Sequence, residues 1–136
     1  MVADELMSES PFVVQVTDSI RRAMAQLTES DVRHLPVVED GRLVGMVSDR
    51  DLRRLLDPIF EPAPGRAARS EDLERPISLL MSSDVISVQP EAEVEEVIDL
   101  MIEHKIGAVP VTEAGSSKLL GIISYVDVLR AARDVL

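Results

Sequence analysis

Two short stretches decide the fold: Gly-Met-Val-Ser-Asp-Arg-Asp at residues 45–51 and Gly-Ile-Ile-Ser-Tyr-Val-Asp at residues 121–127. Both read glycine, two apolar residues, serine, two further residues and aspartate. In each stretch, an apolar run typical of a buried strand gives way at the serine to a helical pattern. The sequence therefore predicts, twice, a strand that leads directly into a helix.

Two further pairs of segments indicate an internal repeat. Leu-Met-Ser at residues 6–8 recurs at 80–82, and Leu-Pro-Val at 35–37 is matched by Val-Pro-Val at 109–111, in both cases 74 residues later. The glycine-containing stretches lie 76 residues apart, so two residues are inserted between the last two landmarks. Self-similarity at a fixed spacing indicates two copies of one structural unit.

Hydrophobic periodicity gives the same order of elements in both repeats. In the first repeat we expect strands at 13–16, 35–38 and 43–47 and helices at 19–27 and 49–56. In the second repeat we expect strands at 85–88, 108–111 and 119–123 and helices at 94–104 and 125–135. Asp40-Gly41 favours a tight hairpin because both residues accept a positive φ. The predicted class is α/β, with two β-α-β-β-α repeats.

Proline and glycine mark the boundary between the repeats. We expect repeat 1 at residues 1–57, a linker at 58–75 and repeat 2 at 76–136. Three prolines and a glycine within residues 58–65 break any helix that continues from the first repeat. The pattern allows helix to resume within 67–80, where Pro76 favours a helix start or an interruption.

Composition excludes several classes of protein. The 136 residues are 46% hydrophobic and 29% charged, which is typical of a globular chain. A net charge of -11 repels phosphate, so we expect no nucleic-acid partner. No apolar run approaches the length of a membrane span, and the N-terminus carries acids where a signal peptide carries bases. We therefore expect a cytoplasmic protein with no membrane partner.

The repeated serines and aspartates have two interpretations. Ser48 and Ser124 are typical N-caps, and Asp51 and Asp127 can bond back to them as in a capping box. Aspartate is, however, shorter than the Glu or Gln that this box favours. A helix start with free N–H groups also suits a phosphate, and a nearby carboxylate can accept both hydroxyls of a ribose. The pattern therefore fits a nucleoside site as well as a cap.

On these residues the chain resembles the tandem cystathionine beta-synthase-type (CBS) domain pair, also called a Bateman module. The resemblance runs from Leu6 to about Ala132. It rests on the Met-Ser pairs that open the two repeats, at residues 7–8 and 81–82 (the Met-Ser openings). It rests also on Val-Arg-His-Leu-Pro-Val-Val at 32–38, on Ile-Gly-Ala-Val-Pro-Val at 106–111 and on the two Gly-x-x-Ser-x-x-Asp segments. One such segment is weak evidence, whereas two in register with two strand motifs are specific.

The resemblance implies a fold and a class of ligand. The two repeats would pack with pseudo-two-fold symmetry and bind AMP, ADP, ATP or S-adenosylmethionine in clefts between them. It assigns the ribose to Asp51 and Asp127, with Ser48 and Ser124 beside the ribose or phosphate. It places adenine near four residues of the strands: Leu35, Pro36, Val109 and Pro110.

The two expected sites differ in charge. Arg33 and His34 precede the Leu-Pro-Val strand of repeat 1, where some nucleotide-binding members of the family carry basic residues that bind phosphate, whereas repeat 2 has Gly107-Ala108. Phosphate binding is therefore expected at the first site. The alternative for Arg33 and His34 is a solvated strand edge.

These features favour a binding module over an enzyme. We expect a stand-alone sensor of an adenosine-containing ligand that regulates an unknown effector protein, with no obligatory cofactor and no metal. The chain contains no cysteine and no nucleophile or phosphate-loop motif, so we expect no catalytic activity. We also expect a homodimer, because small repeats of this kind leave apolar helix faces uncovered. The alternative function is a structural dimerisation module with vestigial clefts.

Overall fold

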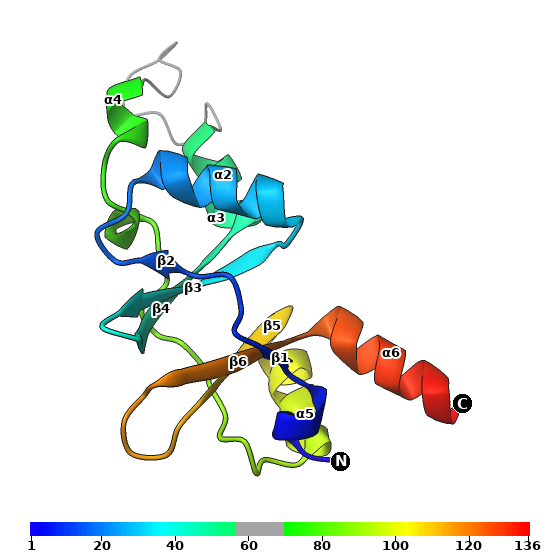
Figure 1. Ribbon diagram of the computed structural model, residues 1–136. Coiled ribbons are helices and arrows are strands. Elements are labelled where there is room, and N and C mark those ends of the chain that lie inside the picture. Colours follow the sequence, from blue (N-terminus) through cyan, green and yellow to red (C-terminus); the bar gives the residue numbers. More distant parts are fainter. Residues whose placement is uncertain (57–69) are drawn as a thin grey trace. The chain divides into compact units, whose positions relative to one another are not determined.

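The computed structural model describes residues 1–56 and 70–136, and these form two compact units (Figure 1). The repeat-1 unit contains Phe12–Glu39 and Val44–Val85, and the repeat-2 unit contains Met1–Pro11, Asp40–Leu43 and Ile86–Leu136. Most of the expected linker at 58–75 lies outside the described residues. None of the described helices is long and apolar enough to cross a bilayer.

The repeat-1 unit is built on the sheet β2-β3-β4. Its elements are β2 (Val14–Gln15), α2 (Ile20–Ser30), β3 (His34–Glu39), β4 (Arg42–Ser48), α3 (Asp49–Leu56), α4 (Ser70–Leu73) and the 3-10 helix η2 (Ile77–Leu79), although the first two residues of β4 are grouped with the other unit. Strand β2 runs parallel to β3, with Val14 opposite Val37. The expected order strand, helix, strand, strand, helix is therefore confirmed in this repeat.

The repeat-2 unit is built on the sheet β1-β6-β5. Its elements are α1 (Ala3–Leu6), β1 (Ser8–Glu9), α5 (Val94–His104), β5 (Ala108–Thr112), β6 (Leu119–Ser124) and α6 (Tyr125–Val135). The α/β class with two repeats is thus confirmed, and the helices at 49–56, 94–104 and 125–135 have the expected bounds.

The prediction of a strand at 85–88 is wrong in its extent, because the observed pairing is much shorter. Only Val88 pairs, through an isolated parallel bridge to Val111. In repeat 1 the ladder continues, because Val16 N donates to the Val38 carbonyl at 3.0 Å. The matching position in repeat 2 is Pro90, which has no N–H, so the ladder stops after one bridge.

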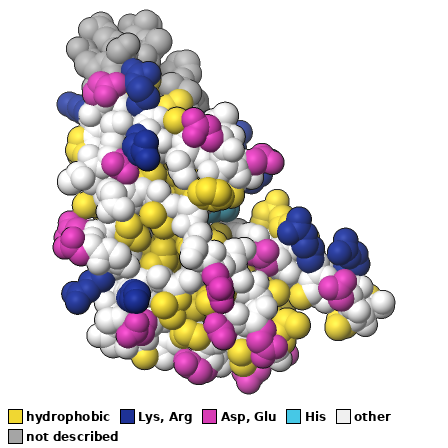
Figure 2. All heavy atoms as spheres, in the orientation of Figure 1, with side chains coloured by type: hydrophobic (Ala, Val, Ile, Leu, Met, Phe, Trp, Pro, Cys, Tyr) yellow, Lys and Arg dark blue, Asp and Glu magenta, His cyan; other side chains and the backbone are white. Residues whose placement is uncertain are grey.

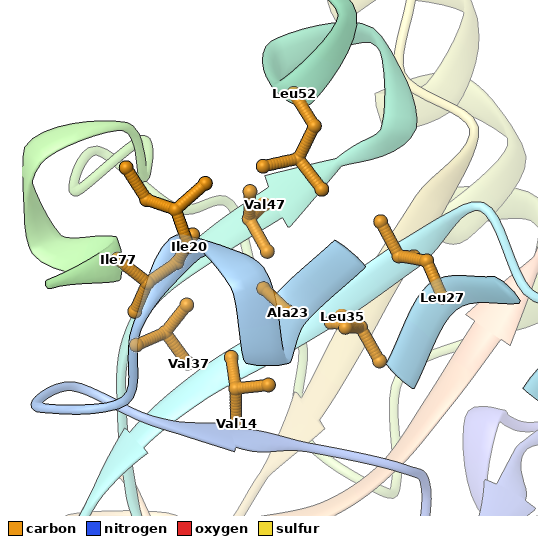
Figure 3. Close-up of a cluster of buried hydrophobic side chains, with 9 residues drawn as sticks. All are labelled: Val14, Ile20, Ala23, Leu27, Leu35, Val37, Val47, Leu52 and Ile77. Carbon is orange, nitrogen blue, oxygen red and sulfur yellow. The ribbon is translucent and has the colours of Figure 1, made fainter. Parts of the chain in front are cut away.

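Each unit has its own hydrophobic core. The repeat-1 core contains the expected α2 stripe, Ile20, Ala23 and Leu27, packed on alternate residues of the sheet (Figure 3). The repeat-2 core brings Val97 of α5 onto Val109, Val111 and Ile123. Each fully buried aliphatic side chain stabilises its unit by about 1.5–3 kcal/mol.

The segments that open the two repeats are exchanged between the units. In β1, Ser8 lies opposite Ile122 and Glu9 opposite Gly121, so the opening of repeat 1 extends the sheet of repeat 2. Conversely, Ser82 bridges to Met46 in β4, with backbone N–O distances of 2.9 and 2.8 Å. Each structural unit therefore contains the Met-Ser opening of the other repeat.

Glycine makes this exchange possible. A Cβ at Gly121 would lie 2.5 Å from Met7 Sδ and 2.8 Å from the Ser8 carbonyl oxygen. A Cβ at Gly45 would lie 2.5 Å from Met81 Sδ and 3.1 Å from the Ser82 carbonyl oxygen. The glycines of the two repeated stretches thus leave room for the methionines and for the backbone beside them.

We expect Gly121→Ala to lower the free energy of unfolding by about 1–3 kcal/mol, the usual effect of overpacking. Gly45→Ala should cost less, because its backbone neighbour is farther away and the Met81 side chain can move. The measurement is chemical denaturation of both variants. Gly115→Ala is the control. Gly115 has a φ of +80°, and a Cβ added there would meet no atom within 4 Å, so this variant tests backbone strain alone. A Gly121→Ala protein as stable as wild type would contradict this account of the exchange.

Candidate functional site

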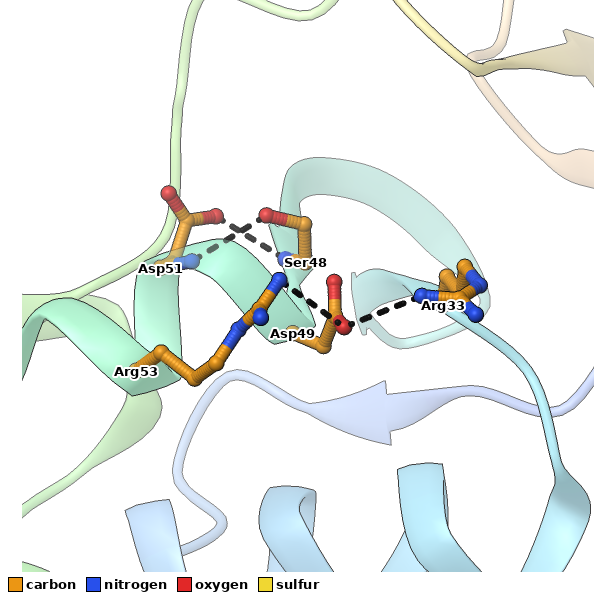
Figure 4. A network of polar contacts seen from close by, with 5 residues as sticks. All are labelled: Arg33, Ser48, Asp49, Asp51 and Arg53. Carbon is orange, nitrogen blue, oxygen red and sulfur yellow. Dashed lines mark hydrogen bonds and ion pairs between the residues drawn. The ribbon is translucent and has the colours of Figure 1, made fainter.

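Both repeated aspartates close a capping box at the start of a helix. At α3, Ser48 N donates to Asp51 Oδ2 at 2.9 Å, and Asp51 N donates to Ser48 Oγ at 3.2 Å (Figure 4). At α6, Ser124 N donates to Asp127 Oδ2 at 2.8 Å, and Asp127 N donates to Ser124 Oγ at 3.3 Å. The Ser124 hydroxyl also donates to Asp127 Oδ2 at 3.0 Å.

The argument that aspartate is too short for a capping box is wrong for both repeats. Helical side chains tilt toward the N-terminus of the helix, and this brings Oδ2 within reach of the N-cap N–H. The Ser–Asp spacing therefore has a complete structural explanation, and its expected role in ribose binding stays a prediction.

The cap uses one oxygen of each carboxylate. Within residues 1–56 and 70–136, Oδ1 of Asp51 and Oδ1 of Asp127 have no hydrogen-bond partner. All four capping side chains belong to half-buried residues. Among the described residues, each helix start therefore keeps one carboxylate oxygen without a donor.

Asp51 also lines a pocket of about 300 Å³ within the repeat-1 unit. Arg54 and Leu55 complete the α3 side, and Leu79 and Leu80 form the other wall. The sequence predicts only part of this pocket lining, because residues 51, 54 and 55 have the spacing of one helix face. The contribution of Leu79 and Leu80 depends on the exchanged opening segment, which local patterns do not predict.

Arg33 lies just before β3 and is engaged by an acid that the sequence analysis did not single out. Its Nη1 is 3.5 Å from Asp49 Oδ2, and Arg53 Nη2 lies 3.4 Å from the same oxygen (Figure 4). In addition, Asp49 N donates to the Arg33 carbonyl at 3.0 Å. The i,i+4 spacing indicates the contact to Arg53, whereas the contact to Arg33 needs the tertiary fold.

His34 begins β3 and is half-buried. Burial lowers its pKa below 6.5, and Arg33 and Arg50 lower it further. Asp49 and Asp51 raise the pKa, but their effect is smaller than that of burial and the net shift is downward. His34 is therefore a neutral imidazole near pH 7, able to donate or accept a hydrogen bond but not to supply a positive charge.

The His34 pKa predicts how stability changes with pH. Below about 6.5 the unfolded chain binds a proton that the folded chain does not, so the free energy of unfolding falls as the pH decreases. The fall ends once the pH passes below the folded pKa. We expect His34→Gln to flatten this part of the stability profile, measured by urea denaturation between pH 5 and 7.5. An unchanged slope in the variant would assign the acid sensitivity to other groups.

The strand residues expected to contact adenine separate into two sets. Leu35 and Val109 point into the cores of their units and are fully buried. Pro36 and Pro110 alternate with them and so face the opposite side of each sheet. Contact between adenine and these four residues stays a prediction.

The structure groups the expected site residues by repeat. Arg33, His34, Ser48 and Asp51 belong to the repeat-1 unit, where the Asp49–Arg33 backbone bond joins the start of β3 to the start of α3. Ser124 and Asp127 belong to the repeat-2 unit, where Ser124 pairs with Ala108. The Arg33 and Asp49 positions are Gly107 and Tyr125 in repeat 2, where Tyr125 N donates to the Gly107 carbonyl at 2.9 Å. The two helix starts thus share a backbone frame and differ in charge.

The comparisons with known proteins identify the family. The model of the CBS domain matches residues 2–58 and 76–134, and the chain therefore belongs to the CBS domain family. A CBS domain-containing protein of Dictyostelium discoideum is 28% identical over 130 residues, which cover 95% of this chain and 89% of the relative. Inosine-5'-monophosphate dehydrogenase of Methanocaldococcus jannaschii is 26% identical over 139 residues, covering 97% of this chain but 25% of that enzyme.

Among solved structures, the chain is similar to CBSX2 crystallised in complex with AMP. The two are 29% identical, superpose with a TM-score of 0.81 and align over 98% of this chain and 97% of the other. This likeness over nearly the whole chain agrees with the CBS pair fold.

Proposed function

We propose that the protein is a cytoplasmic sensor that binds an adenosine-containing ligand, such as AMP, ADP, ATP or S-adenosylmethionine, and regulates a partner protein. Asp51 and Asp127 would accept the ribose hydroxyls, with Ser48 and Ser124 beside them. Arg33 and His34 would serve the first site alone. The proposal includes no catalytic step, and the activity of the dehydrogenase relative is not transferred, because the match covers a quarter of that enzyme.

The observation that carries this proposal is the position of Asp51. Its Oδ2 closes the cap, while the residue lines a pocket of about 300 Å³ that Arg54 and three leucines share with it. A ribose diol needs carboxylate acceptor capacity, an adenine ring needs apolar surface, and a helix start provides N–H groups for a phosphate. The AMP bound to CBSX2, which is 29% identical, supports the same class of ligand here.

One observation favours the alternative, a structural module without a ligand. Both Ser–Asp pairs are accounted for by capping, and a capping box stabilises a helix whether or not a ligand is present. The two functions therefore differ in what the second carboxylate oxygen does, and a substitution that preserves the cap separates them.

Asp51→Asn is that substitution. The asparagine side-chain oxygen can still accept the Ser48 N–H, but an NH₂ group replaces the second acceptor. We expect wild-type protein to gain thermal stability with at least one of AMP, ADP, ATP or S-adenosylmethionine, by about 2.7 kcal/mol at 100 times the Kd. Asp51→Asn should keep the melting temperature of the free protein and weaken binding about tenfold to 150-fold, the loss of a charge-assisted hydrogen bond.

Asp127→Asn is the matched variant and reports whether the second site is used. If it weakens binding as Asp51→Asn does, both sites take ligand; if it has no effect, the first site acts alone. No stabilisation of wild-type protein by any of the four compounds would reject the sensor and favour the structural module.

We also propose that the protein is a homodimer that associates through α6. No described residue of this helix is buried, and Tyr125 and Leu129, one turn apart, are 46% and 61% exposed. Apolar and arginine side chains lie side by side over α6 in Figure 2. Exposed apolar stripes on small domains commonly mark interfaces. We expect light scattering to give the mass of two chains for wild type and of one chain for Leu129→Asp; a monomeric wild type would contradict the proposal.

A further inference from the structure

Two guanidinium groups converge on one carboxylate oxygen beside the first helix start. Arg33 Nη1 and Arg53 Nη2 lie 3.5 and 3.4 Å from Asp49 Oδ2 (Figure 4). The arginine side chains are 69% and 72% exposed, whereas the Asp49 side chain is 34% exposed. The least exposed side chain of the three is therefore that of the anion.

Asp49 stands close to where the proposed site would receive a ligand phosphate. It is the first residue of α3, directly after Ser48 and two residues before Asp51. Arg33, the expected phosphate ligand, is its partner. A phosphate bound to Arg33 would thus share the guanidinium with a carboxylate that is part of the protein.

The net charge around Asp49 follows from the charged residues near the start of α3. Arg33, Arg50, Arg53 and Arg54 supply four positive charges, and Asp49 and Asp51 supply two negative charges. His34 adds no charge near pH 7 because burial keeps it neutral. The two acids therefore offset half of the positive charge around the first site, in a chain of net charge -11.

The second repeat indicates that the acid and the arginine belong together. Where repeat 1 has Arg33 and Asp49, repeat 2 has Gly107 and Tyr125, although the backbone bond between the two positions is kept. Both charges are present in one repeat, and both are absent from the other. Helix capping does not require Asp49, since α6 starts in the same way with Tyr125 in its place.

We propose that Asp49 is an internal counter-anion that sets the ligand class of the first site. It neutralises Arg33 and Arg53, so the site favours adenosine compounds with one phosphate or none over the diphosphate and triphosphate. This inference rests on the proposed function, because it concerns the ligand that Asp51 would hold. Surface ion pairs are weak, so the arginines stay accessible and Asp49 acts through its charge.

A charge mechanism predicts an effect that grows with the charge of the ligand. Removing one negative charge several ångströms from a phosphate, in a solvated site, changes affinity by about threefold for each unit of ligand charge. We therefore expect Asp49→Asn to leave adenosine binding unchanged, to strengthen AMP binding about fivefold to tenfold and to strengthen ATP binding by more than AMP. The gain should shrink in high salt, because the charges are exposed.

The test is isothermal titration of adenosine, AMP and ATP into wild type, Asp49→Asn, Asp49→Asn/Arg33→Ala and Glu74→Gln. Glu74→Gln is the control for net charge, since Glu74 is 61% exposed and pairs with Arg21 on α2. Adenosine is the internal control for folding. We expect the ATP gain in Asp49→Asn alone, and its loss when Arg33 is also removed.

The outcomes separate this inference from the function it rests on. If adenosine compounds bind wild type but Asp49→Asn changes all three affinities by one factor, or Glu74→Gln matches its effect, Asp49 does not set the ligand class and the sensor function stands. If none of the three compounds binds wild type or Asp49→Asn, Asp49 does not set the ligand class, and the sensor function is rejected as well if ADP and S-adenosylmethionine also fail to stabilise wild type.

Discussion

The close approach of the Met-Ser openings to Gly45 and Gly121 is the constraint on which the rest of the structure depends. β4 carries Gly45 and ends at Ser48, and β6 carries Gly121 and ends at Ser124. Each strand therefore meets the opening segment of the other repeat and then sets the helix start of its own. Because a Cβ at Gly121 would lie 2.8 Å from a backbone oxygen, the spacing between strand and opening segment depends on glycine.

This constraint places the two halves of the proposed first site on one framework. The opening of repeat 2 bridges to Met46 and contributes Leu80 to the pocket beside Asp51, and Leu79 comes from the helix η2 just before it. The sequence that precedes one repeat thus completes a pocket of the other. Neither repeat, taken as a continuous stretch of sequence, contains all the residues of its own structural unit.

Local patterns predicted most of the fold, and long-range contacts account for what they missed. Amphipathic spacing predicted the bounds of α3, α5 and α6; the first two bury Leu52 and Val97, whereas no residue of α6 is fully buried. The lost strand at 85–88 depended on a missing N–H at Pro90, which a periodicity argument ignores. Arg33 was predicted as a site residue from its place before β3, but its partner Asp49 lies 16 residues away and is brought near by the hairpin.

The capping boxes explain why structure and ligand binding are difficult to separate in this fold. A helix start concentrates unpaired N–H groups, and the same partial positive charge that a capping carboxylate neutralises also attracts an anionic ligand. An aspartate at the third helical position uses one oxygen for the N-cap N–H and keeps the other for a hydroxyl donor. The carboxylate is oriented by the cap before any ligand arrives, so little side-chain entropy remains to be lost on binding. Capping and ligand recognition are therefore compatible roles for one residue, and the cap would preorganise the carboxylate for the proposed ligand.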